Sequence, residues 1–132
     1  MNLQELSTAV QHCAAVKVVL CNNGYMGMVR QWQELNHGRR YSHSYTAALP
    51  DFVAVAKGFG WSARRVADPS ELEAALAQCL AADGPFFLDV SVVAQENCFP
   101  MIAGGSGHHQ VMLNETTIYQ GGARPGTLES AG

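Results

Sequence analysis

The residues best suited to chemistry are Asn22-Asn23-Gly24, which stand between a β-branched apolar run and a helical pattern that begins near Met26. Asparagine tolerates the tight backbone conformations of a turn, and Gly24 can adopt a positive φ at little steric cost. A strand-to-helix turn lies at the carboxyl edge of a parallel sheet, where free helix N–H groups can hold a phosphate. The neutral side-chain carbonyl of Asn23 suits Mg²⁺. These residues predict a phosphate and magnesium site, with an ordinary turn as the alternative.

Two apolar side chains on the following helix extend this candidate site. Met28 and Trp32 are four residues apart, so they lie on one face of the helix. That face is either part of the core or the wall of a pocket. His37 and His43 follow in an irregular stretch. Near a site they could do acid–base work, and otherwise they are exposed loop histidines.

Two patterns closer to the C-terminus give weaker signals. The glycines of residues 104–107 could cradle a phosphate, but they neither follow a strand nor open a helix, as phosphate-binding loops do. His108 and His109 suggest metal binding, yet adjacent side chains rarely share one ion and no third ligand is near in the sequence. We therefore expect no metal site at these histidines.

The elements that must position these residues alternate between helix and strand. Apolar positions recurring every three to four residues, together with capping residues, predict four helices. These are Met1–Ala14, a helix from near Met26, one that Pro50-Asp51 introduces and Gly60 ends, and one capped by Asp68 with Glu71 in a capping box. Short apolar runs predict strands at Val16–Leu20, Trp61–Val66 and Phe86–Val93, the first buried on both faces and the last also buried.

This order of elements predicts an α/β fold with a parallel sheet flanked by helices and right-handed crossovers. Because the chain opens with a helix, we expect that an upstream strand of the domain is missing. From about Ala94 the pattern fades into a coil-like, glycine-rich segment, and we expect the last twenty or so residues to be mobile.

Composition excludes several classes of function. The 132 residues are 48% hydrophobic and 14% charged, which is typical of one well-buried globular domain. The net charge is −3, which argues against nucleic-acid binding. The arginines form no basic stripe, since they occur as the isolated pairs Arg39-Arg40 and Arg64-Arg65 and as the single residues Arg30 and Arg124. Four cysteines without metal-type spacing suggest reduced thiols. With no signal peptide or membrane span in view, we expect a cytoplasmic protein.

Several longer stretches resemble one enzyme family. They occur in the order found in the C-terminal part of the catalytic subunit of acetolactate synthase, also called acetohydroxyacid synthase. The stretches are LCNNGYMGMVRQWQEL, GRRYSHSY, PDFVAVAKGFG, GPFFLDVSV and Pro100-Met101. The resemblance covers roughly Met1 to Gly107. It implies part of a thiamine-diphosphate-binding domain at residues 1–107 and a polar tail at residues 108–132.

The resemblance also implies a site. In the family, thiamine diphosphate is bound through Mg²⁺, for which Asn23 would supply its side chain and Tyr25 its backbone carbonyl. Gly27 and Met28 would complete the cofactor contacts, and Met28 and Trp32 would line the substrate pocket. The metal-binding aspartate that opens the family motif precedes this stretch, so we expect the chain to be a fragment that starts just after it.

The implied reaction joins two pyruvates, or pyruvate and 2-ketobutyrate, with release of CO₂, in the biosynthesis of valine, leucine and isoleucine. In the family the activating glutamate lies in the partner subunit's N-terminal domain and FAD on a middle domain, so no catalytic residue is expected here and the chain alone is expected to be inactive. The resemblance further implies 2-ketoacid substrates, a homodimer or tetramer and a possible regulatory small subunit.

Two alternatives stay open at this point. The chain could be a non-catalytic α/β fragment, or it could come from another thiamine-diphosphate carboligase such as glyoxylate carboligase. Local departures from the family bear on the loop contacts: Asn36-His37 stands where the family usually has an aromatic pair, and Ala15 stands where it usually has proline.

Overall fold

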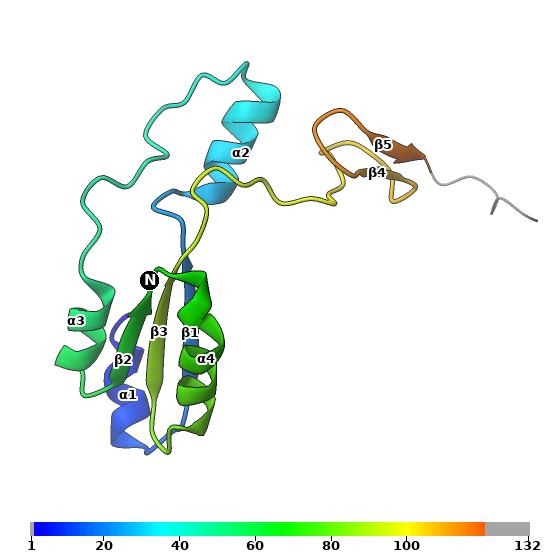
Figure 1. Cartoon of the computed structure of the whole chain (residues 1–132). Coiled ribbons are helices and arrows are strands. Elements are labelled where there is room, and N and C mark those ends of the chain that lie inside the picture. Colours follow the sequence, from blue (N-terminus) through cyan, green and yellow to red (C-terminus); the bar gives the residue numbers. More distant parts are fainter. Residues whose placement is uncertain (1, 121–132) are drawn as a thin grey trace, which may run out of the picture.

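The computed structural model describes residues 2–120 and contains two separate sheets (Figure 1). Its helices and strands alternate in the predicted order as far as the third strand. The helices are α1 (Glu5–Gln11), α2 (Gly27–Asn36), α3 (Phe52–Gly58), the 3₁₀ turn η1 (Pro69–Glu71) and α4 (Leu72–Ala81). The strands are β1 (Lys17–Asn22), β2 (Ser62–Val66), β3 (Phe86–Ser91), β4 (Gln110–Met112) and β5 (Ile118–Gln120).

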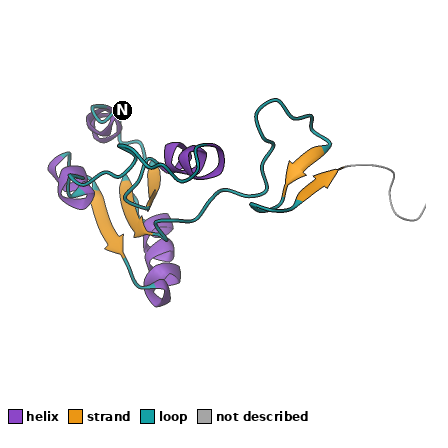
Figure 2. Ribbon diagram, turned by 90° about the horizontal axis from the view of Figure 1, so that it is seen from above, coloured by secondary structure: helices purple, strands orange, loops and turns teal. Residues whose placement is uncertain are grey.

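The main sheet is parallel, as the sequence predicts, with the strand order β1-β3-β2. The central strand β3 pairs on one side with β1 and on the other with β2, so that Leu88 lies opposite Val19 and Arg64. Helices lie on both sides of this sheet (Figure 2). The carboxyl ends of all three strands therefore meet at the same edge, which is also where β1 leads into α2.

Two apolar clusters hold the layers together. On one face, Phe86 and Leu88 of β3 pack with Ala75 and Cys79 of α4, and all four are almost completely buried. On the other face, Trp61 packs with residues of α1 and α3. The indole Nε1 of Trp61 donates a hydrogen bond to the Leu6 carbonyl at 2.8 Å, which satisfies its polar atom and fixes α1.

One strand is less buried than expected. The prediction that Val16–Leu20 would be buried on both faces is wrong in this structure, because β1 lies at the edge of the sheet and the apolar cluster at α4 contains residues of β2 and β3 but none of β1. Val16 and Val19 are 45% and 47% exposed. Burial is instead concentrated in β3, where Leu88 is fully buried, as predicted for that strand.

The helix limits follow the predicted caps in part. Asp51 accepts hydrogen bonds from the N–H groups of Val53 and Ala54, and Asp68 accepts one from Ser70. The predicted capping box at Glu71 is wrong, because its carboxylate pairs with Arg64 at 3.1 Å.

The first helix is also shorter than predicted. It covers Glu5–Gln11 rather than Met1–Ala14, since Gln4 gives no side-chain cap and Cys13 has a φ of +52°.

The C-terminal segment is not all coil. β4 and β5 form an antiparallel hairpin, and Met101 bridges to Met112. Asn114 closes the turn by accepting hydrogen bonds from the N–H groups of Thr116 and Thr117. The hairpin lies apart from the main sheet (Figure 1). The expected mobility of the last twenty residues falls largely on 121–132, outside the described residues, and the domain limit at residue 107 stays a prediction.

Within residues 2–120, the structure has no helix of the length and hydropathy that crossing a membrane requires.

Candidate functional site

The Asn22-Asn23-Gly24 turn has the expected place between strand and helix. The side-chain oxygen of Asn22 accepts a hydrogen bond from the N–H of Gly24 at 3.2 Å, and that of Asn23 accepts one from Tyr25 at 3.1 Å. Gly24 has a φ of +69°, which only glycine adopts without strain. Two consecutive Asx turns thus replace the strand hydrogen bonds and turn the chain into α2.

A second segment braces this turn from the side. The N–H of Met26 donates to the Ser44 carbonyl at 2.8 Å, and the N–H and hydroxyl of Thr46 both donate to the Gly24 carbonyl, at 3.0 and 2.6 Å. The rings of Tyr25 and Tyr45 lie 5.1 Å apart. The irregular stretch that follows α2 therefore pairs at its end with the turn, and this pairing fixes the backbone of the turn.

The oxygen atoms at the turn fit a hard cation. Within residues 2–120, the Tyr25 carbonyl accepts no hydrogen bond, and the Asn23 side-chain oxygen uses one of its two lone pairs. Both are neutral oxygen ligands of the kind Mg²⁺ takes alongside substrate phosphates. A cavity of about 140 Å³ opens beside them, lined by both asparagines, Gly24, Tyr25 and Thr46 among others.

The start of α2 fits an anion. Among the described residues, the N–H groups of Gly27, Met28 and Val29 have no hydrogen-bond partner, and the N-cap Met26 supplies no side-chain acceptor. The first turn of the helix also carries no acidic side chain. These free donors and the helix dipole favour a phosphate group at this end of the helix.

Gly27 allows the turn and the helix to approach closely. A Cβ atom at this position would lie 3.0 Å from the side-chain nitrogen of Asn23, closer than ordinary contact. The absence of a side chain at Gly27 thus lets the Asn23 amide lie against the first turn of α2.

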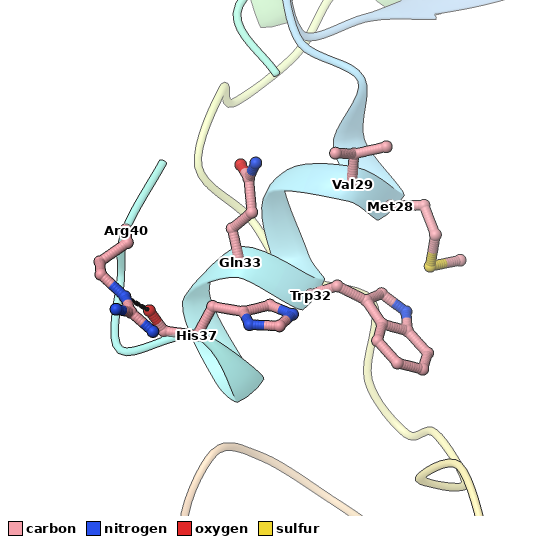
Figure 3. Close-up of a pocket in the computed structure, with 6 residues that line it drawn as sticks. All are labelled: Met28, Val29, Trp32, Gln33, His37 and Arg40. Carbon is pink, nitrogen blue, oxygen red and sulfur yellow. Dashed lines mark hydrogen bonds between the residues drawn. The ribbon is translucent and has the colours of Figure 1, made fainter. Parts of the chain in front are cut away.

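Met28 and Trp32 form one wall of a shallow depression rather than part of the core (Figure 3). Met28 is 63% and Trp32 46% exposed. The depression has a volume of about 550 Å³, and Val29, Gln33, His37 and Arg40 complete its lining. Its surface is thus apolar at the start of α2 and polar toward the end of the helix.

The two candidate histidines lie in different places. His37 lines the depression beside Trp32, whereas His43, with a φ of +52°, lines a separate polar depression next to Tyr25 and Arg30. The structure therefore does not bring them together as an acid–base pair. Among residues 2–120, no group of three or more His, Cys, Asp or Glu side chains is placed to hold a metal ion.

Arg30 and its neighbours form a polar cluster that the sequence did not predict. Arg30 is 6% exposed, lies over the rings of Tyr25 and Tyr41, and pairs with Glu34 at 2.7 Å. Burial alone would raise the pKa of Glu34, but a hydrogen bond from Tyr41 and the charges of Arg30 and Arg39 outweigh it, so the pKa lies below its ordinary value. The carboxylate stays ionised and holds Arg30 against the Tyr25 side of the turn.

Gln31 is a second buried polar residue that the sequence pattern did not predict. Its side-chain oxygen accepts from the Cys98 N–H at 2.8 Å, and its nitrogen donates to the sulfur of Met101 at 2.9 Å. The segment after β3 is thereby fastened to α2. As a result Gly104 approaches Trp32, where a Cβ atom would lie 3.5 Å from the indole ring, and it lines a separate cavity of about 170 Å³. The glycine run does not open a helix.

Asp89 on β3 was also missed. It is fully buried, accepts a hydrogen bond from Asn22 at 3.1 Å and pairs with Arg65 at 2.8 Å. The hydrogen bond to Asp89 raises the pKa of Arg65 above its ordinary value. A polar residue inside the apolar run of residues 86–90 is the one sequence signal that could have pointed to it.

The sequence of this chain is similar to those of known proteins. Residues 1–90 match the family model described as thiamine pyrophosphate enzyme, C-terminal TPP binding domain. The chain is 42% identical to the acetolactate synthase large subunit of Pyropia yezoensis over 113 residues, which are 85% of this chain and 19% of that protein. It is 41% identical to the acetolactate synthase isozyme 3 large subunit of Escherichia coli K12 over 119 residues, 88% of this chain and 21% of that protein.

The fold is also similar to that of a solved structure. The thiamine diphosphate-dependent 4-hydroxybenzoylformate decarboxylase of Rhodococcus jostii RHA1 superposes with a TM-score of 0.64 and 26% identity, covering 72% of this chain and 18% of that one. The chain spans about a fifth of the length of the curated relatives it matches. With a matching family model over most of its length and the corresponding α/β fold, this chain belongs to the thiamine pyrophosphate enzymes and contains sequence of their C-terminal TPP binding domain.

Proposed function

We propose that this chain binds thiamine diphosphate and Mg²⁺ as part of the catalytic subunit of an acetolactate synthase. The reaction would join two pyruvates, or pyruvate and 2-ketobutyrate, to 2-acetolactate or 2-aceto-2-hydroxybutyrate with release of CO₂, in branched-chain amino-acid biosynthesis. The observation that carries the proposal is the turn at residues 22–25, whose free oxygen atoms lie next to the unpartnered N–H groups of α2.

Each part of the site has a role in this proposal. Asn23, through its side chain, and Tyr25, through its backbone carbonyl, would hold Mg²⁺. The N–H groups at Gly27 and Met28 would receive the diphosphate, because the helix dipole favours negative charge there. When bound, the thiamine group would supply the carbon chemistry of decarboxylation and carbon–carbon bond formation.

The chain's own side chains would then determine which ketoacid fits. Met28 and Trp32 present an exposed apolar wall on the helix whose first turn would hold the diphosphate. Contact of the broad indole ring with one extra methylene group favours 2-ketobutyrate over pyruvate as second substrate, an effect of about 1–3 kcal/mol at most.

The remaining requirements of the reaction would be met by other parts of the enzyme. The activating glutamate and the FAD site would lie in other domains of the catalytic subunit. The active unit would be a homodimer or tetramer, and a regulatory small subunit would be a further partner. The four cysteines of this chain are all free, which suits a cytoplasmic location.

Two other functions receive less support. A glyoxylate carboligase shares the cofactor, but the similar curated relatives named above are acetolactate synthase large subunits. A non-catalytic fragment would not require a glycine at position 27, where any side chain would press on Asn23.

Isothermal titration of the purified chain with thiamine diphosphate and Mg²⁺ tests the cofactor site. We expect micromolar binding that requires Mg²⁺ and is weakened at least about tenfold by Asn23→Ala, because a metal ligand is lost. Asn36→Ala, which removes an exposed amide at the other end of α2, is the matched control and should bind as the wild type does. No detectable binding by the wild-type chain, or equal loss in both variants, would contradict the proposal.

A further inference from the structure

The central strand of the sheet contains a buried charge. Asp89 is 0% exposed, and its neighbours in register are Leu20 on β1 and Arg65 on β2. Taking a carboxylate out of water costs several kcal/mol unless both of its oxygens are paired, so a buried aspartate is kept only where its partners compensate it. The partners of Asp89 therefore indicate what it does.

Each oxygen of Asp89 has its own donor. Oδ1 accepts from the side-chain nitrogen of Asn22 at 3.1 Å, and Oδ2 accepts from Nε of Arg65 at 2.8 Å. Arg65 continues to Asp51, which it contacts at 3.0 Å and which caps α3. This chain of contacts links the sheet to α3 on one side and to the end of β1 on the other.

The contact with Asn22 fixes the orientation of an amide. A carboxylate can only accept hydrogen bonds, so Asn22 must direct its NH₂ group toward Asp89. Its carbonyl oxygen then points away, to the N–H of Gly24 at 3.2 Å. If the amide were reversed, NH₂ would face the Gly24 N–H and the first Asx turn would be lost.

We propose that Asp89 is a positioning residue for the Asn22-Asn23-Gly24 turn: it sets the orientation of the Asn22 amide and so holds Asn23 and the Tyr25 carbonyl in place. Its consequence for Mg²⁺ and thiamine diphosphate rests on the proposed function. The effect on the turn itself does not, because the contacts exist without a cofactor.

The substitution Asp89→Asn separates this role from simple space filling. Asparagine has the same shape, but it offers one acceptor and one NH₂ group in place of two acceptors. Arg65 and Asn22 both donate to residue 89, so in the variant one of these two contacts must place two hydrogen-bond donors opposite each other. Either Arg65 loses its partner or Asn22 turns over and releases Gly24.

A second substitution should restore the turn. In the double variant Asn22→Asp, Asp89→Asn, the carboxylate introduced at position 22 accepts from the Gly24 N–H and from the NH₂ group of the amide introduced at position 89. The carbonyl oxygen of that amide in turn accepts from Arg65. Every donor again meets an acceptor, and the net charge is that of the wild type. Asn22→Asp alone would place two carboxylates face to face.

Amide hydrogen exchange at Gly24 and Tyr25, measured by NMR on the full chain without cofactor, tests the inference. We expect Asp89→Asn to speed exchange at Gly24 about tenfold, the effect of losing one hydrogen bond, and the double variant to return it to the wild-type rate. Arg64→Met, which breaks an exposed pair on the same strand β2, should leave the rate unchanged.

Rescue distinguishes a positioning role from a structural one. A double variant that folds but still exchanges fast at Gly24, or an Asp89→Asn variant with wild-type exchange, would overturn the inference. If Asp89→Asn does not fold, the double variant must fold and protect Gly24 for the inference to stand.

Cofactor titration gives the second readout. Affinity for Mg²⁺ and thiamine diphosphate should fall about 10- to 100-fold in Asp89→Asn, as is usual for groups that orient metal ligands, and should recover in the double variant. A wild-type chain that binds no cofactor would refute the proposed function, while the exchange rates would still decide the role of Asp89.

Discussion

The substitution Gly27→Ala tests the geometry of the turn most directly. A Cβ atom at Gly27 would lie 3.0 Å from the side-chain nitrogen of Asn23, whereas ordinary contact begins at 3.4 Å, so the Asn23 amide must move by a few tenths of an ångström. Mg²⁺ requires nearly ideal octahedral geometry with ligands at about 2.0–2.1 Å, and a shift of that size removes the oxygen from its place. We expect the affinity for Mg²⁺ and thiamine diphosphate to fall about 10- to 100-fold.

Folding stability should not fall in parallel. Alanine is favoured over glycine inside a helix by up to about 1 kcal/mol, and this offsets part of the crowding at the first position of α2. Isothermal titration therefore has to be read together with a thermal scan, and the expected result is weaker binding at an unchanged or slightly changed melting temperature.

Gly58→Ala is the matched control. Gly58 ends α3, and a Cβ atom there would meet nothing within 4 Å. Its variant should bind as the wild type does. Unchanged binding by Gly27→Ala would refute the reasoning, because the Asn23 amide would then tolerate displacement and could not be a metal ligand held by close approach.

Three further predictions concern the fold. Leu88→Ala should lower the free energy of unfolding, measured by urea titration, by about 2–5 kcal/mol, because the side chain is fully buried in the central strand. Leu80→Ala is the control, since Leu80 is 72% exposed and its loss should cost well under about 1 kcal/mol. Equal losses in the two variants would contradict the assigned core. The exposed edge strand β1 should make the isolated chain self-associate, and Val19→Lys should shift sedimentation toward the monomer; a wild-type monomer that melts cooperatively would argue against this. Hydrogen bonds from the Ala54 and Ser70 N–H groups lower the pKa of the caps Asp51 and Asp68, whose ordinary value is 3.8. Because each pKa is lower in the folded state, the two caps stabilise the fold fully above about pH 4, and they lose this effect as the pH falls through the folded-state pKa. Between about pH 6 and pH 3 the melting temperature of the wild type should therefore drop more than that of an Asp51→Ala, Asp68→Ala variant.

Local patterns were sufficient to predict most of the fold. The parallel sheet follows from helices alternating with apolar runs, and Asp51 and Asp68 act as the predicted caps because a cap depends only on the next three residues. Burial of β1 was overestimated because an apolar run shows what a strand could bury, not which neighbours cover it. The β4–β5 hairpin was missed because strands of three residues are too short to show a period.

In the candidate site too, the local features could be predicted from the sequence and the long-range contacts could not. The Asn22-Asn23-Gly24 turn and the shared face of Met28 and Trp32 are local features, and the structure has both where they were expected. The roles assigned to Asn23, Tyr25, Gly27, Met28 and Trp32 stay predictions. The contacts of Gln31 and Asp89 could not be predicted, because their partners Cys98 and Asn22 each lie 67 residues away in the sequence. A polar residue within an apolar pattern does not indicate which distant residue it contacts.

The position of β3 has a consequence for how the chain folds. Within residues 2–120, β1 and β2 do not pair with each other, and each is hydrogen-bonded only to β3, which comes last of the three. During synthesis neither strand can form its hydrogen bonds to β3 until residues 86–91 have left the ribosome. The pairing of these three strands therefore comes late and carries a large loop-closure entropy, so it should be slow.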